Sequence, residues 1–178
     1  MSGYELLLFL HVACVIVWLG AGTTLALIAV AAERTRDRML QERLGAIGRW
    51  LGPRVFLPAT LGALAFGLGL VEKGSWTFGP LWIKLGLGAF ATSLLLNATI
   101  RFPLLRRMEG ATGAEAERAG RLLGLLGRVE LAVLYLAVAD MIAKPSASDT
   151  TALVPGGSIL AVAVLGGLVG AARKSVTP

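Results

Sequence analysis

The chain contains one histidine, His11, and it lies inside an apolar stretch that covers 4–32. In a membrane-spanning helix this residue would sit roughly 9 Å below the outer edge of the hydrocarbon core. Helical spacing places it on one stripe with Trp18, and the single cysteine, Cys14, lies one turn away. An imidazole at this depth can be an axial ligand to haem iron, a proton relay, or a structural group hydrogen-bonded to a neighbouring helix. Trp18 would border a flat cofactor or pack inside the bundle.

Copper is an alternative to haem. Cys14 beside His11, and Met141 at a similar depth, supply soft ligands that suit Cu(I). The chain has no Cys pair and no Met-rich motif, so the copper interpretation depends mainly on two candidate ligands on one helix. The third reading is that no cofactor binds. P-loop, GxSxG, HExxH and CxxC motifs do not occur, which argues against a soluble hydrolase or kinase.

Two charged residues are expected at the same depth as His11. Lys84 lies about one turn inside the third apolar stretch, where it either extends to the lipid headgroups or faces a buried anion such as a propionate. Asp140, near the end of the fourth stretch, either pairs with Lys144 four residues later or faces His11 or Lys84. Since all three residues belong to the outer third of the membrane, they can form one polar layer there.

A second polar group is expected toward the opposite, cytoplasmic end. Asn97 and Arg101 are four residues apart and share a helix face, and Glu130 lies at a similar level of the next crossing. An ion pair of Glu130 with Arg101 or with Arg54 would close this end of the bundle. A role of Glu130 in proton transfer is the alternative.

The elements that must position these residues are membrane-spanning helices. Of the 178 residues 56% are hydrophobic and 16% charged, whereas a soluble domain is nearer about 45–50% apolar. Backbone groups in lipid must satisfy their own hydrogen bonds, which favours helices. We predict an all-α, polytopic membrane helix bundle in one domain over 1–178, with a four-helix core plus one further helix. The five transmembrane helices are expected at about 5–32, 55–72, 80–100, 122–143 and 153–172.

The distribution of basic residues predicts the orientation. Six arginines lie between the first and second helices and five between the third and fourth, with Arg128 near the start of the fourth. Each of the other two loops holds one lysine. Because basic loops remain in the cytoplasm, the N-terminus should be outside and the C-terminus cytoplasmic. The net charge of +6 then reflects topology and contacts with anionic lipids, and it does not indicate binding to nucleic acid.

Two segments have expected roles outside the core. The stretch 34–51 repeats apolar residues at helical spacing among arginines, which predicts a basic amphipathic cytoplasmic helix on the inner leaflet, or an extension of the first crossing. Gly166 and Gly170 form a GxxxG motif in the fifth segment, which favours contact in a homo-oligomer or a larger membrane complex.

Three short motifs in this chain resemble motifs of a known group of membrane proteins. They are HVACVIVWLGAG from His11, LWIKLGL around Lys84, and DMIAKP from Asp140. Over about 4–145 the chain resembles a loose superfamily of small bacterial membrane proteins. It includes HemJ-type protoporphyrinogen oxidases, the membrane domain of CopD-type copper-resistance proteins, and a large uncharacterised set of integral membrane proteins, to which the chain is most similar.

The resemblance implies a cofactor and two of its residues. HemJ-type proteins are four-helix membrane bundles that bind haem b and need a His on the first helix and a Lys on the third. His11 and Lys84 match these two positions. The HemJ pattern continues into a Tyr-Leu-Pro-Arg stretch with a second His, whereas this chain has Gly22, Thr23 and Thr24 there. CopD-type proteins imply copper handling instead.

From these residues we expect a multi-pass protein of the bacterial cytoplasmic (inner) membrane that binds haem b and serves redox chemistry. His11 would be the axial metal ligand, Trp18 would line the pocket, and Lys84 would hold a propionate or a second axial position. The alternatives are a non-catalytic accessory subunit, a copper-handling protein, and a proton-coupled carrier that uses His11, Asp140 and Glu130. The polar groups expected to support the site are Cys14, Asp140, Glu130, Asn97 and Arg101.

Overall fold

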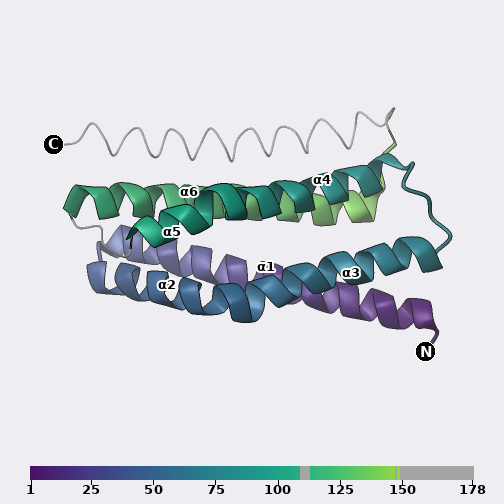
Figure 1. Cartoon of the computed structure of the whole chain (residues 1–178), viewed down its shortest axis with the longest axis horizontal. Helices are drawn as coiled ribbons and strands as arrows, with labels where there is room; N and C mark the ends of the chain where they lie inside the picture. Colours follow the sequence, from purple (N-terminus) through teal and green to yellow (C-terminus); the bar gives the residue numbers. More distant parts are fainter. Residues whose placement is uncertain (109–112, 147, 149–178) are drawn as a thin grey trace. The chain divides into compact units, whose positions relative to one another are not determined.

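The computed structural model describes residues 1–108, 113–146 and 148, and every regular element in this part of the chain is helical (Figure 1). The helices form two units, one over Met1–Phe78 and one that begins at Gly79, and each unit is a hairpin of long helices. The elements of the first unit are α1 (Gly3–Thr35), α2 (Arg38–Leu51), η1 (Gly52–Phe56) and α3 (Leu57–Lys73). The elements of the second unit are α4 (Leu81–Leu96), η2 (Asn97–Arg101), α5 (Phe102–Met108) and α6 (Gly113–Ala143).

Local sequence signals set the ends of α1. Ser2 caps its N-terminus: the hydroxyl accepts a hydrogen bond from the Glu5 backbone N–H at 3.2 Å, and the Glu5 carboxylate accepts one from the Ser2 N–H at 2.8 Å. At the other end Arg36 adopts a left-handed conformation with φ 54°, which ends the helix. Asp37 then caps α2 by accepting from the Leu40 N–H at 2.9 Å.

The elements η1 and η2 are π-helical turns, and each is followed by a proline. In an α-helix the rings of Pro58 and Pro103 would strike the carbonyl groups four residues earlier. Those carbonyls belong to Arg54 and Thr99, which lie inside η1 and η2 respectively. A wider π turn relieves the clash while the helix continues in the same general direction.

Four helical stretches of the described residues are long and apolar enough to cross a membrane, which supports the expected all-helical membrane protein. Their bounds differ from the sequence-based ones. The fourth begins at Gly113 where 122 was expected, since its first turns are charged and give no apolar signal. The third continues through η2 as far as Met108. The fifth expected crossing, 153–172, lies outside the described residues.

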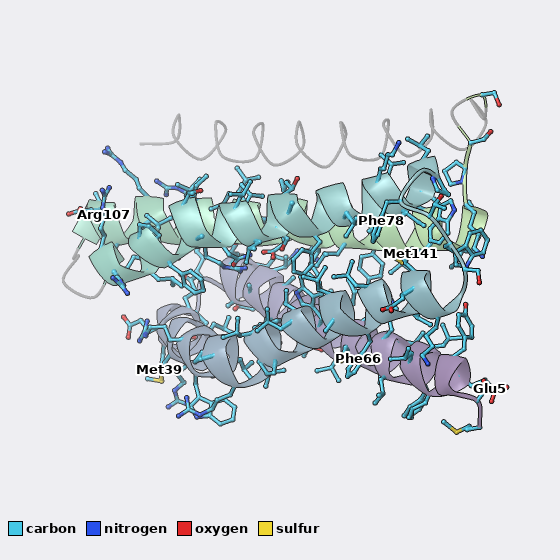
Figure 2. All side chains as sticks on the ribbon, turned by 45° about the vertical axis from the view of Figure 1, so that its right-hand side comes forward. Glu5, Met39, Phe66, Phe78, Arg107 and Met141 are labelled. Atoms are coloured by element: carbon cyan, nitrogen blue, oxygen red, sulfur yellow. The ribbon has the colours of Figure 1, made fainter. Side chains whose placement is uncertain are left out.

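The expected amphipathic segment 34–51 is largely the helix α2. It packs against α1 and continues through η1 into α3, so it extends the second crossing (Figure 1). One of the two expectations had been that this segment extends the first crossing. Leu40, Leu44 and Leu51 are partly covered, whereas Met39, on another face, is 64% exposed and projects outward (Figure 2). Ile47, which belongs to the same apolar repeat, is 45% exposed, so packing on α1 covers only part of the amphipathic face.

Candidate functional site

The helices α1 and α3 make the most extensive packing in the first unit, and a row of small residues on α3 permits it. Ala59 and Ala63 are buried. A Cβ atom added at Gly62 would lie 2.7 Å from the sulfur of Cys14, so an alanine there would push the thiol aside. The helix backbones approach closely there, as small residues allow between membrane helices.

His11 lies against this row. Its Nδ1 is 2.7 Å from the backbone carbonyl oxygen of Ala63. A Cβ atom at Gly67 would come within 3.1 Å of the His11 Cε1 and 3.2 Å of Nδ1, so the ring rests on the α3 backbone one turn beyond Ala63. The half-buried imidazole therefore faces a neighbouring helix.

The hydrogen bond defines the tautomer of His11. A carbonyl oxygen can only accept, so Nδ1 must carry the proton. In the neutral ring Nε2 then keeps its lone pair, and within the described part of the chain His11 makes no other hydrogen bond. Histidines that bind metals commonly hold their second nitrogen in this way, by donating to a backbone carbonyl. The hydrogen bond thus fixes one face of the ring on α3 and leaves the Nε2 lone pair unused by the described residues.

The two other residues singled out on α1 have different surroundings. Cys14 is a free thiol whose sulfur packs at Gly62. Trp18 is buried, at 8% exposed. Among the residues that the structure describes, no three His, Cys, Asp or Glu side chains gather as a metal-binding group. The donor set on α1 is thus a single oriented imidazole with a thiol one turn away.

The second unit contains the polar cluster expected at the cytoplasmic end. Arg101 Nη1 donates to Glu130 Oε2 at 2.7 Å, which confirms the ion pair in its Arg101 form. Glu130 Oε1 accepts from Asn97 Nδ2 at 2.8 Å and from Ser93 Oγ at 2.5 Å. Arg54, the other partner considered for Glu130, instead stacks on Trp50 in the first unit, with its Cζ 5.2 Å from the ring centre.

The turn η2 aligns the three donors of this cluster. In an α-helix residues four apart are rotated by about 40°, so Ser93, Asn97 and Arg101 would drift steadily around the helix. The wider turn over Asn97–Arg101 rotates each residue less and removes part of that drift. All three side chains therefore reach Glu130 on α6. Sequence reasoning missed Ser93, although the spacing of 93, 97 and 101 is a signal that could have found it.

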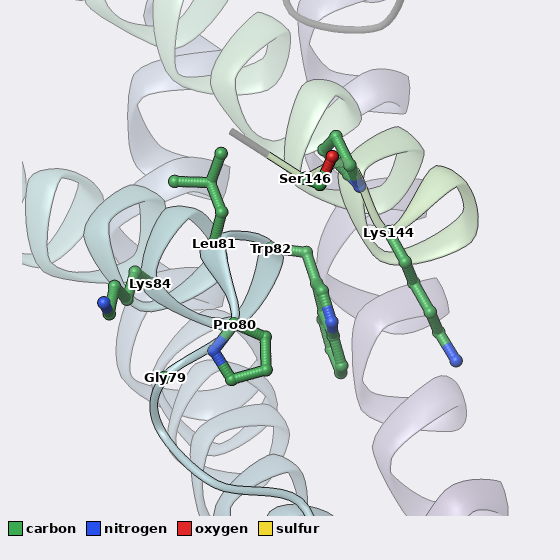
Figure 3. Close-up of a pocket in the computed structure, with 8 residues that line it drawn as sticks. Gly79, Pro80, Leu81, Trp82, Lys84, Lys144 and Ser146 are labelled. Carbon is green, nitrogen blue, oxygen red and sulfur yellow. The ribbon is translucent and has the colours of Figure 1, made fainter. Parts of the chain in front are cut away.

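Lys84 and Asp140 lie in the second unit and make no contact with each other that the structure describes. Lys84 is exposed, as expected for a side chain that extends to headgroups. Figure 3 shows the Lys144 side chain beside the Trp82 ring and the Lys84 side chain pointing away from both. The cavity there has a volume of about 500 Å³ and is lined by Gly79, Pro80, Leu81, Trp82, Lys84, Lys144, Pro145 and Ser146.

The expected hydrogen-bonded pair of Asp140 with Lys144 does not form. α6 ends at Ala143, and Lys144 takes a left-handed conformation with φ 47°, which turns it off the helical path. Its Nζ lies 5.4 Å from the centre of the Trp82 ring. Within the described residues both Asp140 oxygens are buried without a hydrogen-bond partner. Asp140 belongs to the second unit and His11 to the first, so a shared layer of His11, Lys84 and Asp140 stays a prediction.

Comparison of the chain with family models, with curated proteins and with solved structures finds no match. The functional assignment therefore rests on the residues themselves.

Proposed function

We propose that this chain is a multi-pass membrane protein of redox function that binds haem b through His11. The observation that carries the proposal is the hydrogen bond between His11 Nδ1 and the Ala63 carbonyl, which leaves Nε2 as a lone-pair donor. A structural histidine would make the same hydrogen bond to a neighbouring helix, so the proposal depends on the second nitrogen, Nε2, which has no partner among the described residues.

The His11 side chain fits the proposed group. Imidazole is the usual axial ligand of haem iron in proteins, and the bound haem would supply a one-electron couple. His11 would hold the iron, and the Ala63 carbonyl would keep the ring from rotating and increase the basicity of Nε2. Trp18, on the same helix as His11, would pack beside the group.

The topology that goes with this function is the five-crossing arrangement in the bacterial cytoplasmic membrane, with the N-terminus outside and the C-terminus in the cytoplasm. The four long apolar helices and the two arginine-rich turns support it. The GxxxG motif of the fifth segment would then serve contacts with another copy or with a larger membrane complex.

The test is the absorption spectrum of the full chain, purified after expression with haem supply, in oxidised and reduced forms. We expect a Soret band with near-stoichiometric iron, lost or strongly reduced in His11→Ala and retained in Cys14→Ser. Wild-type protein without a Soret band would refute the proposal. Stoichiometric copper without iron, lost in both variants, would favour the copper alternative.

A further inference from the structure

Trp50 and Arg54 stand where the first unit is expected to leave the hydrocarbon core of the membrane. Arg54 lies 19 residues before Lys73, which ends α3. At the helical rise this is roughly 29 Å, close to the thickness of about 30 Å for a bilayer core. In the predicted orientation η1 therefore marks the cytoplasmic boundary, at the level of the lipid phosphates.

The charge of Arg54 is not neutralised by any carboxylate that the structure describes. Its guanidinium lies over the ring of Trp50 at 5.2 Å, and Trp50 is itself 56% exposed. The stack on Trp50 holds the Arg54 guanidinium in a defined position while leaving its N–H donors for an external acceptor.

Exposed leucines continue from this point toward the membrane centre. Leu57, Leu61 and Leu68 have exposed fractions of 49%, 51% and 39% and recur at helical spacing, on the side of α3 away from the buried Ala59 and Ala63. From Leu57 to Leu68 the helix rises roughly 16 Å, about half of the bilayer core and thus one leaflet.

We propose that Trp50, Arg54 and the three leucines bind one anionic phospholipid of the cytoplasmic leaflet. The Arg54 guanidinium would donate to the phosphate in a two-point contact, as arginine does with planar or tetrahedral anions. Trp50 would pack beside the glycerol region, as interfacial tryptophans do. One acyl chain would lie along Leu57, Leu61 and Leu68.

The test compares lipid binding to the full chain in detergent micelles by native mass spectrometry, with phosphatidylglycerol as the probe and phosphatidylcholine as the neutral lipid. The variant Arg54→Gln should weaken phosphatidylglycerol binding about fivefold, the factor that corresponds to about 1 kcal/mol for one basic residue at a membrane surface. The matched control is Arg49→Gln, which removes the same charge from an exposed neighbour on α2 whose guanidinium folds back toward Gly45.

We expect Arg49→Gln to change phosphatidylglycerol binding less than twofold, and Arg54→Lys, which keeps the charge and loses the planar stack, to fall between the two. Phosphatidylcholine, whose phosphate is next to its own choline cation, should bind more weakly and lose less than twofold in each variant. Equal losses in Arg49→Gln and Arg54→Gln would overturn the proposal in favour of diffuse attraction. Displacement of the lipid by excess inorganic phosphate would equally overturn it, because the site would then recognise a free anion. Helix content by circular dichroism shows that each variant is folded.

Discussion

Removal of Arg101 should destabilise the protein more than removal of Glu130. Both belong to the same ion pair, but the Glu130 side chain is 11% exposed and that of Arg101 is 35% exposed. In Arg101→Gln the Glu130 carboxylate stays buried, with only Ser93 and Asn97 as hydrogen-bond donors. In Glu130→Gln the neutral amide oxygen keeps the Ser93 and Asn97 hydrogen bonds, and Arg101 can turn toward solvent.

The magnitudes follow from this asymmetry. Loss of one partner of a buried pair costs about 3–5 kcal/mol, and the partial exposure of Arg101 points to the lower limit, about 3 kcal/mol for Arg101→Gln. Glu130→Gln removes one charge-assisted hydrogen bond, at about 1–1.5 kcal/mol. The double variant should cost less than the two single variants together, by about 1.5 kcal/mol, since neither charge is then left unpaired.

The assay is unfolding of the full chain in detergent by titration with a denaturing detergent, followed by helix content, for the two single variants and the double variant. Arg106→Gln on α5 is the matched control, because this exposed arginine takes no part in the cluster, and its free energy of unfolding should change by less than about 0.5 kcal/mol. Equal costs for the two single variants, or strictly additive costs in the double variant, would refute the reasoning.

Two further predictions concern single side chains. Gly67→Ala should displace the His11 ring from Ala63, because the new Cβ would lie 3.1 Å from Cε1. The expected result is a shifted or weakened haem absorption band. The control is Gly88→Ala, whose Cβ would meet nothing within 4 Å and which should leave the spectrum unchanged. Asp140→Asn should raise the free energy of unfolding at neutral pH by about 1 kcal/mol, since it replaces a buried carboxylate, to which no described residue donates a hydrogen bond, by a neutral group of the same shape. A loss of stability in the same detergent assay would mean that Asp140 has a partner.

The existence of the helices could be predicted from the sequence, whereas their continuity could not. Long apolar runs marked the four crossings, but the charged first turns of α6, from Gly113 onward, carry no such signal. Pro58 and Pro103 indicate interrupted helices by sequence rules. In the structure the wider turns η1 and η2 accommodate the prolines without ending the helix, because a π turn moves the clashing carbonyl group aside.

The candidate sites show a similar division. The Glu130–Arg101 pair could be predicted because both groups are charged, and charges at membrane depth need partners. The Ala63 carbonyl that fixes His11 could not, since a backbone acceptor leaves no mark in the sequence. Lys144 misled the prediction for Asp140, because spacing of four residues pairs two side chains only while the helix continues, and α6 ends at Ala143.

The most direct test of haem ligation by His11 is the reduced spectrum of the full-length His11→Gly variant titrated with imidazole. The substitution removes the side chain and leaves room for the free base beside Ala63 and Gly67. We predict that the Soret and reduced α bands are lost in the variant and return as imidazole is added. A variant that keeps the wild-type spectrum without imidazole would contradict the assignment of His11 as the axial ligand.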